Sequence, residues 1–599
     1  MAILIELIIL NIISRFHLIH IIIIFSYFYY YSHGLEFHDH GYFNFIGFIA
    51  LISFTIIVCL PFNIVIFLAI KIKKITYKII ILLFIPLFLY LVFHLKDLYD
   101  KTISDCSDWP KGLNNTYIDN EKSKYSCHLK YPKNCSYHFY QYFQDYTKIS
   151  RKKCENRVGN EKEKLLKLST SPYINDKVNR IGYPLTNKDK ECMKDFIDTK
   201  NLIQKYFLHN LVDMDNEKIL EKYFENRTPE IYADFTNKKQ PKLNINLRFN
   251  KTLSEERKLK EKNSKPLSKN ILLLYIDSVS RVVSLRQLKK TLKFFEKFMS
   301  YNGAFNEKYP DENFHSFQFF KYNSFYYYTE GNYPLLFYGQ KRGKKKDKKT
   351  MIPRSIYLKE NGFITGYLGD YCDKDNIRTF HNYKLKEAYD HQFILCDPNT
   401  ELININTIRC LYGKKVIEHL YEYGEQFWRK YKNNRKYLSI ITNDGHEGTL
   451  ETLKYADDTI YNFLNNLFND NLLKDTTVLL LSDHGSGMPS IYHFSDFYKI
   501  EEGLPMFYMI VNDKKNISYN EQYQYIHENQ QILITAYDIY NTIGHIIYGD
   551  KYKDINAKTA LNDTHKSEYG SSLFEEIEDG KKRTSKKYSK IERINNICG

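Results

Sequence analysis

The sequence predicts an α/β fold with a mostly parallel central sheet covered by helices on both faces, preceded by membrane-spanning helices. Between residues 270 and 547, short apolar runs alternate with longer segments that carry apolar residues at helical spacing. Strands that are apolar along their whole length belong to parallel sheets buried between helices. Three long apolar segments in the first hundred residues indicate the membrane helices.

The alternation of strands and helices can be followed along the chain. After the first apolar run, Leu285, Leu288, Leu292 and Phe295 form a helical stripe. No internal repeat interrupts the order. The expected strands lie within 270–277, 362–370, 436–444, 476–485 and 504–513, and the expected helices within 285–300, 410–432, 454–473 and 534–547.

The apolar segments of the first hundred residues are 3–31, 42–70 and 75–95. A helix of about 20 apolar residues crosses a bilayer, and the second and third segments carry at most one charged residue each. The first contains Glu6 and Arg15, so it is a tilted span, a signal-like anchor or a span with a polar kink. We expect residues 1–96 to form a membrane region with two to three transmembrane helices.

The loops between these segments predict their orientation. The basic loop Lys71–Lys74 joins the last two segments, and positively charged loops stay in the cytosol. The chain after about residue 96 is then lumenal or extracellular, in the endomembrane system or at the plasma membrane. Glycosylation triplets and most cysteines lie in this part, which predicts a glycoprotein with disulfide bonds. They are Asn114, Asn134, Asn226, Asn250, Asn516 and Asn562, and Cys106, Cys127, Cys135, Cys154, Cys192, Cys372, Cys396, Cys410 and Cys598.

Differences in composition divide the rest of the chain into three regions. Residues 97–269 are polar, contain cysteines and are weakly periodic, which predicts a stem or cap whose end, 241–250, is a strand. Residues 270–585 form the expected main domain, and 586–599 form a C-terminal tail. The formal net charge of +16 comes largely from basic loops, which are usually solvated. We therefore expect no nucleic-acid partner.

Three expected strands end on residue types that bind metals. Each ending alone is also ordinary turn sequence. Ligands collect at the carboxyl ends of the strands in open α/β sheets, however, and carboxylate and imidazole groups suit a divalent cation. Together the endings predict a metal site at one edge of the sheet. The residues are Asp277 after the first strand, Asp444 and His446 after the third, and Asp483 and His484 after the fourth.

Ester chemistry at such a site also needs a nucleophile. Thr329 precedes a segment that can open a helix, with Asn332 one turn further and Gly339 at its end. A threonine at a helix start is most often a cap, but beside a cation its hydroxyl is activated for attack on phosphorus or sulfur. Ser278 and Ser280 are rival nucleophiles, for which we expect turn roles.

The stretch from Asn270 to about Ser585 resembles the alkaline phosphatase and sulfatase superfamily. It resembles more narrowly the superfamily's membrane-anchored branch called domain of unknown function 229. The order of the matching stretches along the chain carries the resemblance more than any one of them. They include ILLLYIDSVSR, YNSFYYYTEGNYPLLFYG, ITNDGHEGTLETLKYADD, TTVLLLSDHGSG and GSSLFEEI.

The resemblance implies a three-layer α/β/α alkaline-phosphatase-like domain with a divalent metal ion, which is zinc, manganese or magnesium. Asp277, Thr329, Asp483 and His484 match the family's first metal site, with Thr329 as the nucleophile. His446 matches a histidine that in relatives binds a second metal or the substrate's phosphoryl or sulfuryl oxygens. Asp444 is a further candidate ligand.

The sequence also departs from the family's pattern. The sulfatase signature Cys-x-Pro-x-Arg is absent, which favours phosphoryl over sulfuryl chemistry. Thr442 stands where relatives often have an Asp, and Asp444 lies two residues before the histidine. Aromatic residues and Glu330 surround Thr329 where relatives carry small residues and a proline. Asp370, Asp390, His391 and His493 are candidates to complete the site.

The sequence is compatible with three functions. The first is a membrane-anchored, metal-dependent phosphoryl or sulfuryl transferase or hydrolase acting on an ester, such as a lipid-linked or glycan substrate. The second is a pseudoenzyme that keeps the fold as a binding or structural ectodomain. The third is a transporter or scaffold working through the membrane part, which the lack of paired intramembrane charges disfavours.

Overall fold

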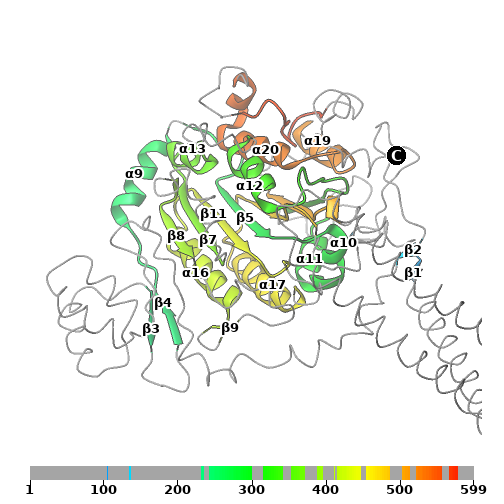
Figure 1. Ribbon diagram of the computed structural model, residues 1–599. Coiled ribbons are helices and arrows are strands. Elements are labelled where there is room, and N and C mark those ends of the chain that lie inside the picture. Colours follow the sequence, from blue (N-terminus) through cyan, green and yellow to red (C-terminus); the bar gives the residue numbers. More distant parts are fainter. Residues whose placement is uncertain are drawn as a thin grey trace, which may run out of the picture. The chain divides into compact units, whose positions relative to one another are not determined.

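A computed structural model gives the chain an α/β domain built on one seven-stranded sheet (Figure 1). This domain lies within the compact unit formed by residues 105–135 and 140–599. The structure describes residues 104–105, 113, 134–135, 231–234, 242–262, 264–299, 314–340, 352–370, 388–394, 410–411, 414–446, 453–485, 502–512, 521–555 and 566–577.

The order of strands across the sheet is β6-β13-β12-β5-β11-β7-β8. All neighbouring pairs are parallel except the two that involve β13. The predicted mostly parallel sheet is therefore confirmed. The strands are β5 (Asn270–Ile276), β6 (Phe314–Gln318), β7 (Ile364–Gly369), β8 (His391–Ile394), β11 (Lys436–Thr442), β12 (Thr476–Leu481) and β13 (Phe507–Asn512).

The central strand β5 is buried along its whole length because both of its faces are covered. Successive side chains of a strand point to opposite faces. Leu272 and Leu274 pack into the core on one face, and Ile271, Leu273 and Tyr275 pack into the core on the other. The continuous apolar run that predicted a parallel sheet is the consequence of these two cores.

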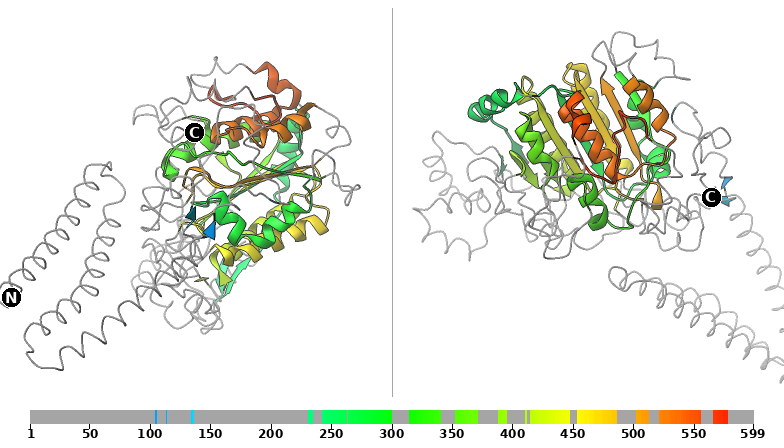
Figure 2. Two further views of the ribbon diagram at one scale, coloured as in Figure 1. Left: turned by 90° about the vertical axis from the view of Figure 1, so that its right-hand side faces the viewer. Right: turned by 90° about the horizontal axis from the view of Figure 1, so that it is seen from above.

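Helices form a layer on each side of the sheet, as Figure 2 shows. Each helix turns an apolar face to one of the two cores. The arrangement fits the expected three-layer α/β/α domain. The helices of one layer are α10 (Arg281–Gln287), α11 (Lys289–Glu296), α16 (Val416–Lys430) and α17 (Lys454–Asn469), and those of the other are α12 (Thr329–Tyr338), α13 (Arg354–Glu360) and α20 (Ala536–Tyr548).

The helical stripe expected at 285–300 is divided into two helices. Leu288 ends α10 and also begins α11, with φ −99° and ψ 47° outside the helical region. The side chain of Leu288 is fully buried between them. Apolar periodicity predicted the helical residues but not this break, since Leu288 fits the stripe.

Sequence reasoning missed α9 (Lys251–Glu261) and β6 altogether. Arg257 of α9 pairs with Asp390 beside β8 at 2.6 Å, and both side chains are buried. The packed domain therefore includes a helix upstream of the expected boundary at Asn270. The smaller elements are β1 (Ser104–Asp105), β2 (Asn134–Cys135), β3 (Ile231–Asp234), β4 (Lys242–Ile245), β9 (Cys410–Leu411), β10 (Lys414–Lys415), α19 (Glu521–Asn529) and η7 (Gly549–Asp554).

Among the described residues, no helix combines the length and the apolar character needed to cross a membrane. The segments predicted as membrane spans, 3–31, 42–70 and 75–95, lie outside the described residues. The side chains of all ten cysteines also lie outside them, so the predicted disulfide bonds and membrane topology stay predictions.

Candidate metal centre

Two neighbouring strands bring the first acidic residues together. β5 and β12 are parallel, with Leu481 beside Tyr275, so Asp277 and Asp483 leave the sheet at the same edge. The backbone N–H of Asp277 donates to the carbonyl of Thr442 at 2.8 Å, which ties this edge to β11 as well. Asp277, Asp483 and His484 each offer a ligand atom, and these atoms all lie within 4.8 Å of one another. All three side chains are buried.

The ring of His484 is oriented by its own neighbour. Nδ1 lies 2.7 Å from the carbonyl oxygen of Gly485, which can only accept a hydrogen bond. Nδ1 is therefore the donor in this contact, and in the neutral ring this tautomer leaves the lone pair on Nε2. Nε2 lies 3.4 Å from Oδ2 of Asp483 and 3.6 Å from Oδ1 of Asp277. A histidine held in this way by a carbonyl is the usual arrangement of a metal ligand.

Thr329 reaches the same point from the first turn of α12. Its hydroxyl lies 3.2 Å from Oδ1 of Asp277 and 3.3 Å from Nε2 of His484. The residue that caps α12 is Tyr328, and no side chain makes a capping hydrogen bond there. The Thr329 hydroxyl is thus directed at the acids, and the common role of a threonine as a helix cap does not apply.

The start of α12 is fixed by Asn332. Its side-chain oxygen accepts from the backbone N–H groups of Phe325 at 3.0 Å and Tyr326 at 2.9 Å. Its amide nitrogen donates to the carbonyl of Tyr326 at 2.7 Å. α12 ends at Gly339, whose φ of 66° suits a residue without Cβ. The helix expected between Thr329 and Gly339 is confirmed.

The rival hydroxyls have other partners. Ser280 caps α10 by accepting from the N–H of Val283 at 3.1 Å, so its role is that of a helix cap and not the expected turn role. Ser278 is buried at the site with its hydroxyl 3.4 Å from Nδ1 of His484, on the side of the ring away from Thr329. Its φ of 60° is unusual for a residue with a side chain and indicates local backbone strain.

The charge balance of the site suits a cation. Burial raises the pKa of Asp277 well above its ordinary value, and the nearby charge of Asp483 raises it further. Oδ2 of Asp483 is buried and accepts no hydrogen bond from the described residues. Two buried carboxylates facing each other are costly unless a positive charge lies between them. The residues therefore fit a divalent metal ion, and the role of each as a ligand stays a prediction.

The residues proposed for a second cation lie at the next strand end. Gly445 packs against the backbone of Asp277, where a Cβ atom would lie 2.4 Å from the Asp277 carbonyl oxygen. Asp444 and His446 flank this glycine, and the N–H of His446 donates to the carbonyl of Asn443 at 3.0 Å. Neither belongs to the group of mutually close ligand atoms found among the described residues. Their part in a second cation site stays a prediction.

Other residues were candidates to complete the metal site, and those that the structure describes bond to different partners. Asp390 pairs with Arg257 and accepts from Thr365, and His391 bonds the Tyr431 hydroxyl at 3.0 Å, so neither reaches the site. Asp370 is buried at the end of β7 and accepts from the N–H of Asn443 at 3.0 Å. His493 lies outside the described residues.

Sequence reasoning missed Tyr275. This residue is two positions before Asp277, so strand alternation places its side chain on the same face. Its ring is fully buried, and burial together with the charges of Asp483 and Asp277 raises the pKa of its hydroxyl well above the ordinary value. Because every second side chain of a strand points to the same face, the position of Tyr275 two residues before Asp277 could have identified it.

No curated protein matches the chain. Among solved structures, the C-terminal periplasmic domain of EcEptC from Escherichia coli is 12% identical, with a TM-score of 0.33, covering 51% of this chain and 88% of that one. The lipoteichoic acid synthase LtaP from Listeria monocytogenes is 10% identical, with a TM-score of 0.35, covering 54% and 81%. A protein in the alkaline phosphatase superfamily from Vibrio parahaemolyticus is 12% identical, with a TM-score of 0.32, covering 49% and 74%.

A family model gives the identification that these distant structures do not. The model described as protein of unknown function (DUF229) matches residues 147–598 of the 599-residue chain. This range contains every candidate ligand and the candidate nucleophile. The predicted family is confirmed, and the protein belongs to the DUF229 family.

Proposed function

We propose that the protein is a metal-dependent phosphoryl transferase or hydrolase, with sulfuryl transfer less favoured, and that Thr329 is its nucleophile. One observation carries the proposal. The Thr329 hydroxyl makes no capping hydrogen bond at the start of α12 and lies within 3.3 Å of both Asp277 and His484. A hydroxyl that only stabilised the helix would face the backbone N–H groups of α12.

The chain's own residues account for most of the mechanism. Asp277, Asp483 and His484 would hold the cation, and the Thr329 hydroxyl lies beside them. A bound divalent cation lowers the pKa of an adjacent hydroxyl and neutralises charge on the transferred group. The Thr329 hydroxyl would lose its proton to solvent as its oxygen forms a bond to phosphorus, while the bond to the leaving oxygen breaks and that oxygen takes a proton from solvent. Water or an acceptor alcohol would next attack the phosphorus and give up its proton, and the bond from phosphorus to the Thr329 oxygen would break with that oxygen regaining a proton.

The start of α12 adds a second source of stabilisation. The positive end of a helix and its free N–H groups favour an anion. Because Thr329 is the first residue of α12, a phosphoryl group on its oxygen lies at that end. We assign His446 to the far side of the transferred group, where it binds another oxygen or a second cation, as the family resemblance implies.

We propose further that the domain is anchored to a membrane and faces the lumen or the extracellular side, with a phospho- or sulfo-ester substrate that is lipid-linked or part of a glycan. The basic loop Lys71–Lys74 and the glycosylation triplets support this topology. Asn250, one of the six acceptors, is exposed at the start of α9. Glycosidase treatment should increase the protein's gel mobility. Absence of glycan on every triplet, together with a cytosolic tag after residue 100, would contradict the topology.

The central experiment compares Thr329→Ala with Thr329→Ser in the purified full-length chain. The alanine variant should lose phosphoester turnover, and the serine variant should keep part of it, because only serine retains the hydroxyl. Ser278→Ala is the matched control and should retain turnover. Wild-type turnover by Thr329→Ala would remove Thr329 from the mechanism. A wild-type protein that binds metal but turns over no phosphoester or sulfoester would favour the pseudoenzyme.

A further inference from the structure

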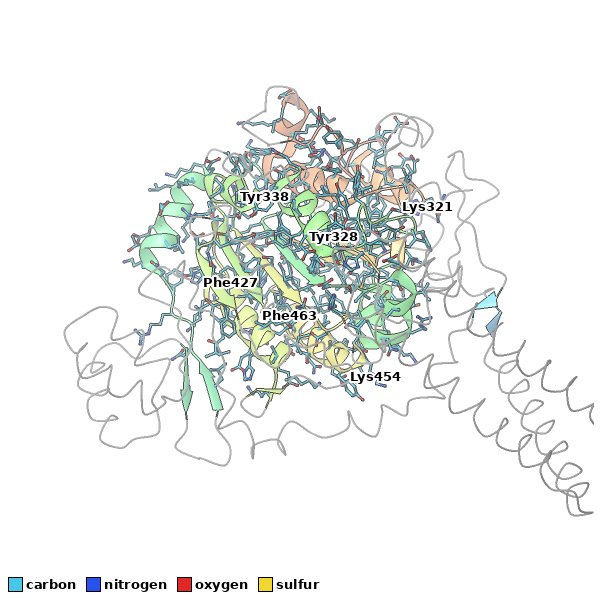
Figure 3. The ribbon with its side chains drawn as sticks, in the orientation of Figure 1. Lys321, Tyr328, Tyr338, Phe427, Lys454 and Phe463 are labelled. Carbon is cyan, nitrogen blue, oxygen red and sulfur yellow. The ribbon has the colours of Figure 1, made fainter. Side chains whose placement is uncertain are left out.

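The segment before Thr329 presents aromatic rings to solvent beside the candidate nucleophile. Tyr327 and Tyr328 are 42% and 43% exposed, while Thr329 is only 8% exposed. Five large apolar or aromatic side chains are exposed among the described residues, and these two directly precede the nucleophile. Figure 3 labels Tyr328 where α12 begins. Exposed aromatic side chains next to a candidate active site suit a ligand that packs against the faces of their rings.

The rings are held in position by the structure around them. The Tyr326 and Tyr328 rings lie 5.5 Å apart and are tilted by 37°. Tyr326 also packs on Gly331, where an added Cβ would lie 2.4 Å from its ring. Asn332 fixes the backbone of Tyr326, as described above. The rings therefore form a prepared surface, which lowers the entropic cost of binding.

An acid accompanies these rings. Glu330 follows Thr329 in the first turn of α12 and is partly exposed. The residue before it, Thr329, has its hydroxyl 3.2 Å from Oδ1 of Asp277. The Glu330 carboxylate therefore belongs to the same helix turn as the candidate nucleophile. A third carboxylate there repels an anionic ester unless the ester brings a positive charge of its own.

We propose that Tyr326, Tyr327, Tyr328 and Glu330 form a binding surface for an ammonium group carried by the substrate. The inference rests on the proposed function and names its substrate class, a zwitterionic phosphoester of the phosphocholine or phosphoethanolamine type. Cations bind over the faces of tyrosine rings, and a carboxylate supplies the opposite charge. The proposal explains together the two departures from the family's pattern at this position, the aromatic residues and Glu330.

A neutral ligand would use the same rings without the acid. A sugar ring or an apolar chain packs on tyrosine but gains nothing from the charge of Glu330. The test therefore compares phosphocholine with 3,3-dimethylbutyl phosphate, which has the same shape with carbon in place of the charged nitrogen. Binding is measured by calorimetry in metal-loaded, full-length Thr329→Ala protein, so that the result does not depend on turnover.

Phosphocholine should bind about 2- to 30-fold more tightly than the neutral ester, as a cation over aromatic rings predicts. Glu330→Gln and Tyr328→Leu should each reduce this ratio, and Tyr328→Phe should preserve it because the ring remains. Phe249→Leu, at another exposed aromatic residue that lies before α9, should leave the ratio unchanged. Equal binding of the two esters, or a ratio unaffected by Glu330→Gln, would overturn the inference.

The outcomes separate this inference from the proposed function. A binding preference for phosphocholine in a protein whose wild type turns over no phosphoester would sustain the ammonium site and refute the enzyme. Turnover of both esters with equal binding affinity would support the enzyme and refute the ammonium site. Comparing glycerophosphocholine with lysophosphatidylcholine in mixed micelles identifies the source of the group. Tighter binding of the lipid indicates a lipid headgroup, and equal binding indicates a soluble ester.

Discussion

The Thr329 hydroxyl donates to Oδ1 of Asp277 at 3.2 Å across 52 positions of sequence. The contact exists because β5 ends at the edge of the sheet where α12 begins. The contact joins the candidate nucleophile to Asp277. Burial and the charge of Asp483 raise the pKa of this carboxyl group, so a nearby positive charge would stabilise its ionised form.

Asp483→Asn should abolish stoichiometric binding of a divalent metal, because one of two anionic ligands becomes neutral. Asp457→Asn is the matched control. Asp457 is also a buried acid, but it accepts from the backbone N–H groups of Lys290 and Thr291 at 2.8 Å and lies away from the site. This control should keep its metal and lose about 1–3 kcal/mol of stability. Elemental analysis after dialysis gives the metal content, and equal contents in the two variants would contradict the site.

The sequence was sufficient to predict this convergence for a simple reason. Strands that are apolar throughout run parallel in a covered sheet, so residues just after them share one edge. This reasoning brought Asp277, Asp483 and His484 together, but it also placed Asp444 and His446 there, and neither joins the group of close ligand atoms among the described residues. The proton position on His484 could not be predicted in this way, because the carbonyl of Gly485 is a backbone group whose direction the sequence does not show.

Other parts of the prediction depended on distant partners. Asp390 and His391 had the right chemistry for the site, but Arg257 and Tyr431 engage them instead. These partners come from α9 and from the end of α16, and no local pattern links them. The break at Leu288 is similar, because a buried leucine fits an unbroken helix as well as a junction between two.

The metal-free protein should become less stable as pH rises, in part through Asp277. Its folded pKa lies above the unfolded value of 3.8. The folded state therefore binds the proton more tightly, and the extra stability is present below the unfolded pKa and lost as pH rises through the folded pKa. Asparagine does not titrate, so the Asp277→Asn variant should not lose this part of its folding stability as pH rises. In the presence of a chelator, the variant should gain stability relative to the wild type as pH rises above 3.8.

Chemical denaturation at several pH values measures this difference. The metal-loaded proteins should show the opposite order, because only the wild type gains stability from the cation. If the chelated wild type and Asp277→Asn proteins keep a constant difference in unfolding free energy across the range, Asp277 does not carry the raised pKa.

Tyr275→Phe should weaken metal binding while leaving the fold intact. The Tyr275 hydroxyl and Oδ2 of Asp483 are both buried, and neither makes a hydrogen bond that meets strict geometry within the described residues. The Asp483 charge still acts on the hydroxyl. The hydroxyl is therefore close enough to donate to Asp483 once a cation fixes that carboxylate, and loss of such a support typically costs about 10- to 100-fold in metal affinity.

Tyr508→Phe is the control for the loss of a buried phenol. The Tyr508 hydroxyl bonds Ser284 at 3.0 Å, in the core on the opposite face of the sheet. Calorimetric titration with zinc should give a weaker dissociation constant for Tyr275→Phe alone. Equal constants for the two variants would show that Tyr275 only fills space beneath the site.

Lys436 provides a test of the fold that is independent of the site. It begins β11 at the end of the strand away from the metal centre, and its side chain is buried. Nζ donates to Oδ1 of Asn270 at 3.2 Å and lies 4.8 Å from the centre of the Trp428 ring. Burial lowers the pKa of Lys436 from 10.5 to about 7. The unfolded chain thus binds this proton more tightly than the folded protein does.

Since the unfolded state holds the proton between about pH 7 and 10.5, the wild-type protein should gain stability from Lys436 as pH rises through this window. Lys436→Met removes the titration and keeps an apolar chain of similar length. The stability of the variant relative to the wild type should therefore be greatest near pH 7 and should fall toward pH 10. Lys430→Met, at an exposed lysine near the end of α16, controls for the loss of a positive charge. Denaturant titrations at pH 7, 8.5 and 10 measure the difference, and a Lys436→Met profile parallel to that of Lys430→Met would show that the buried lysine stays charged throughout.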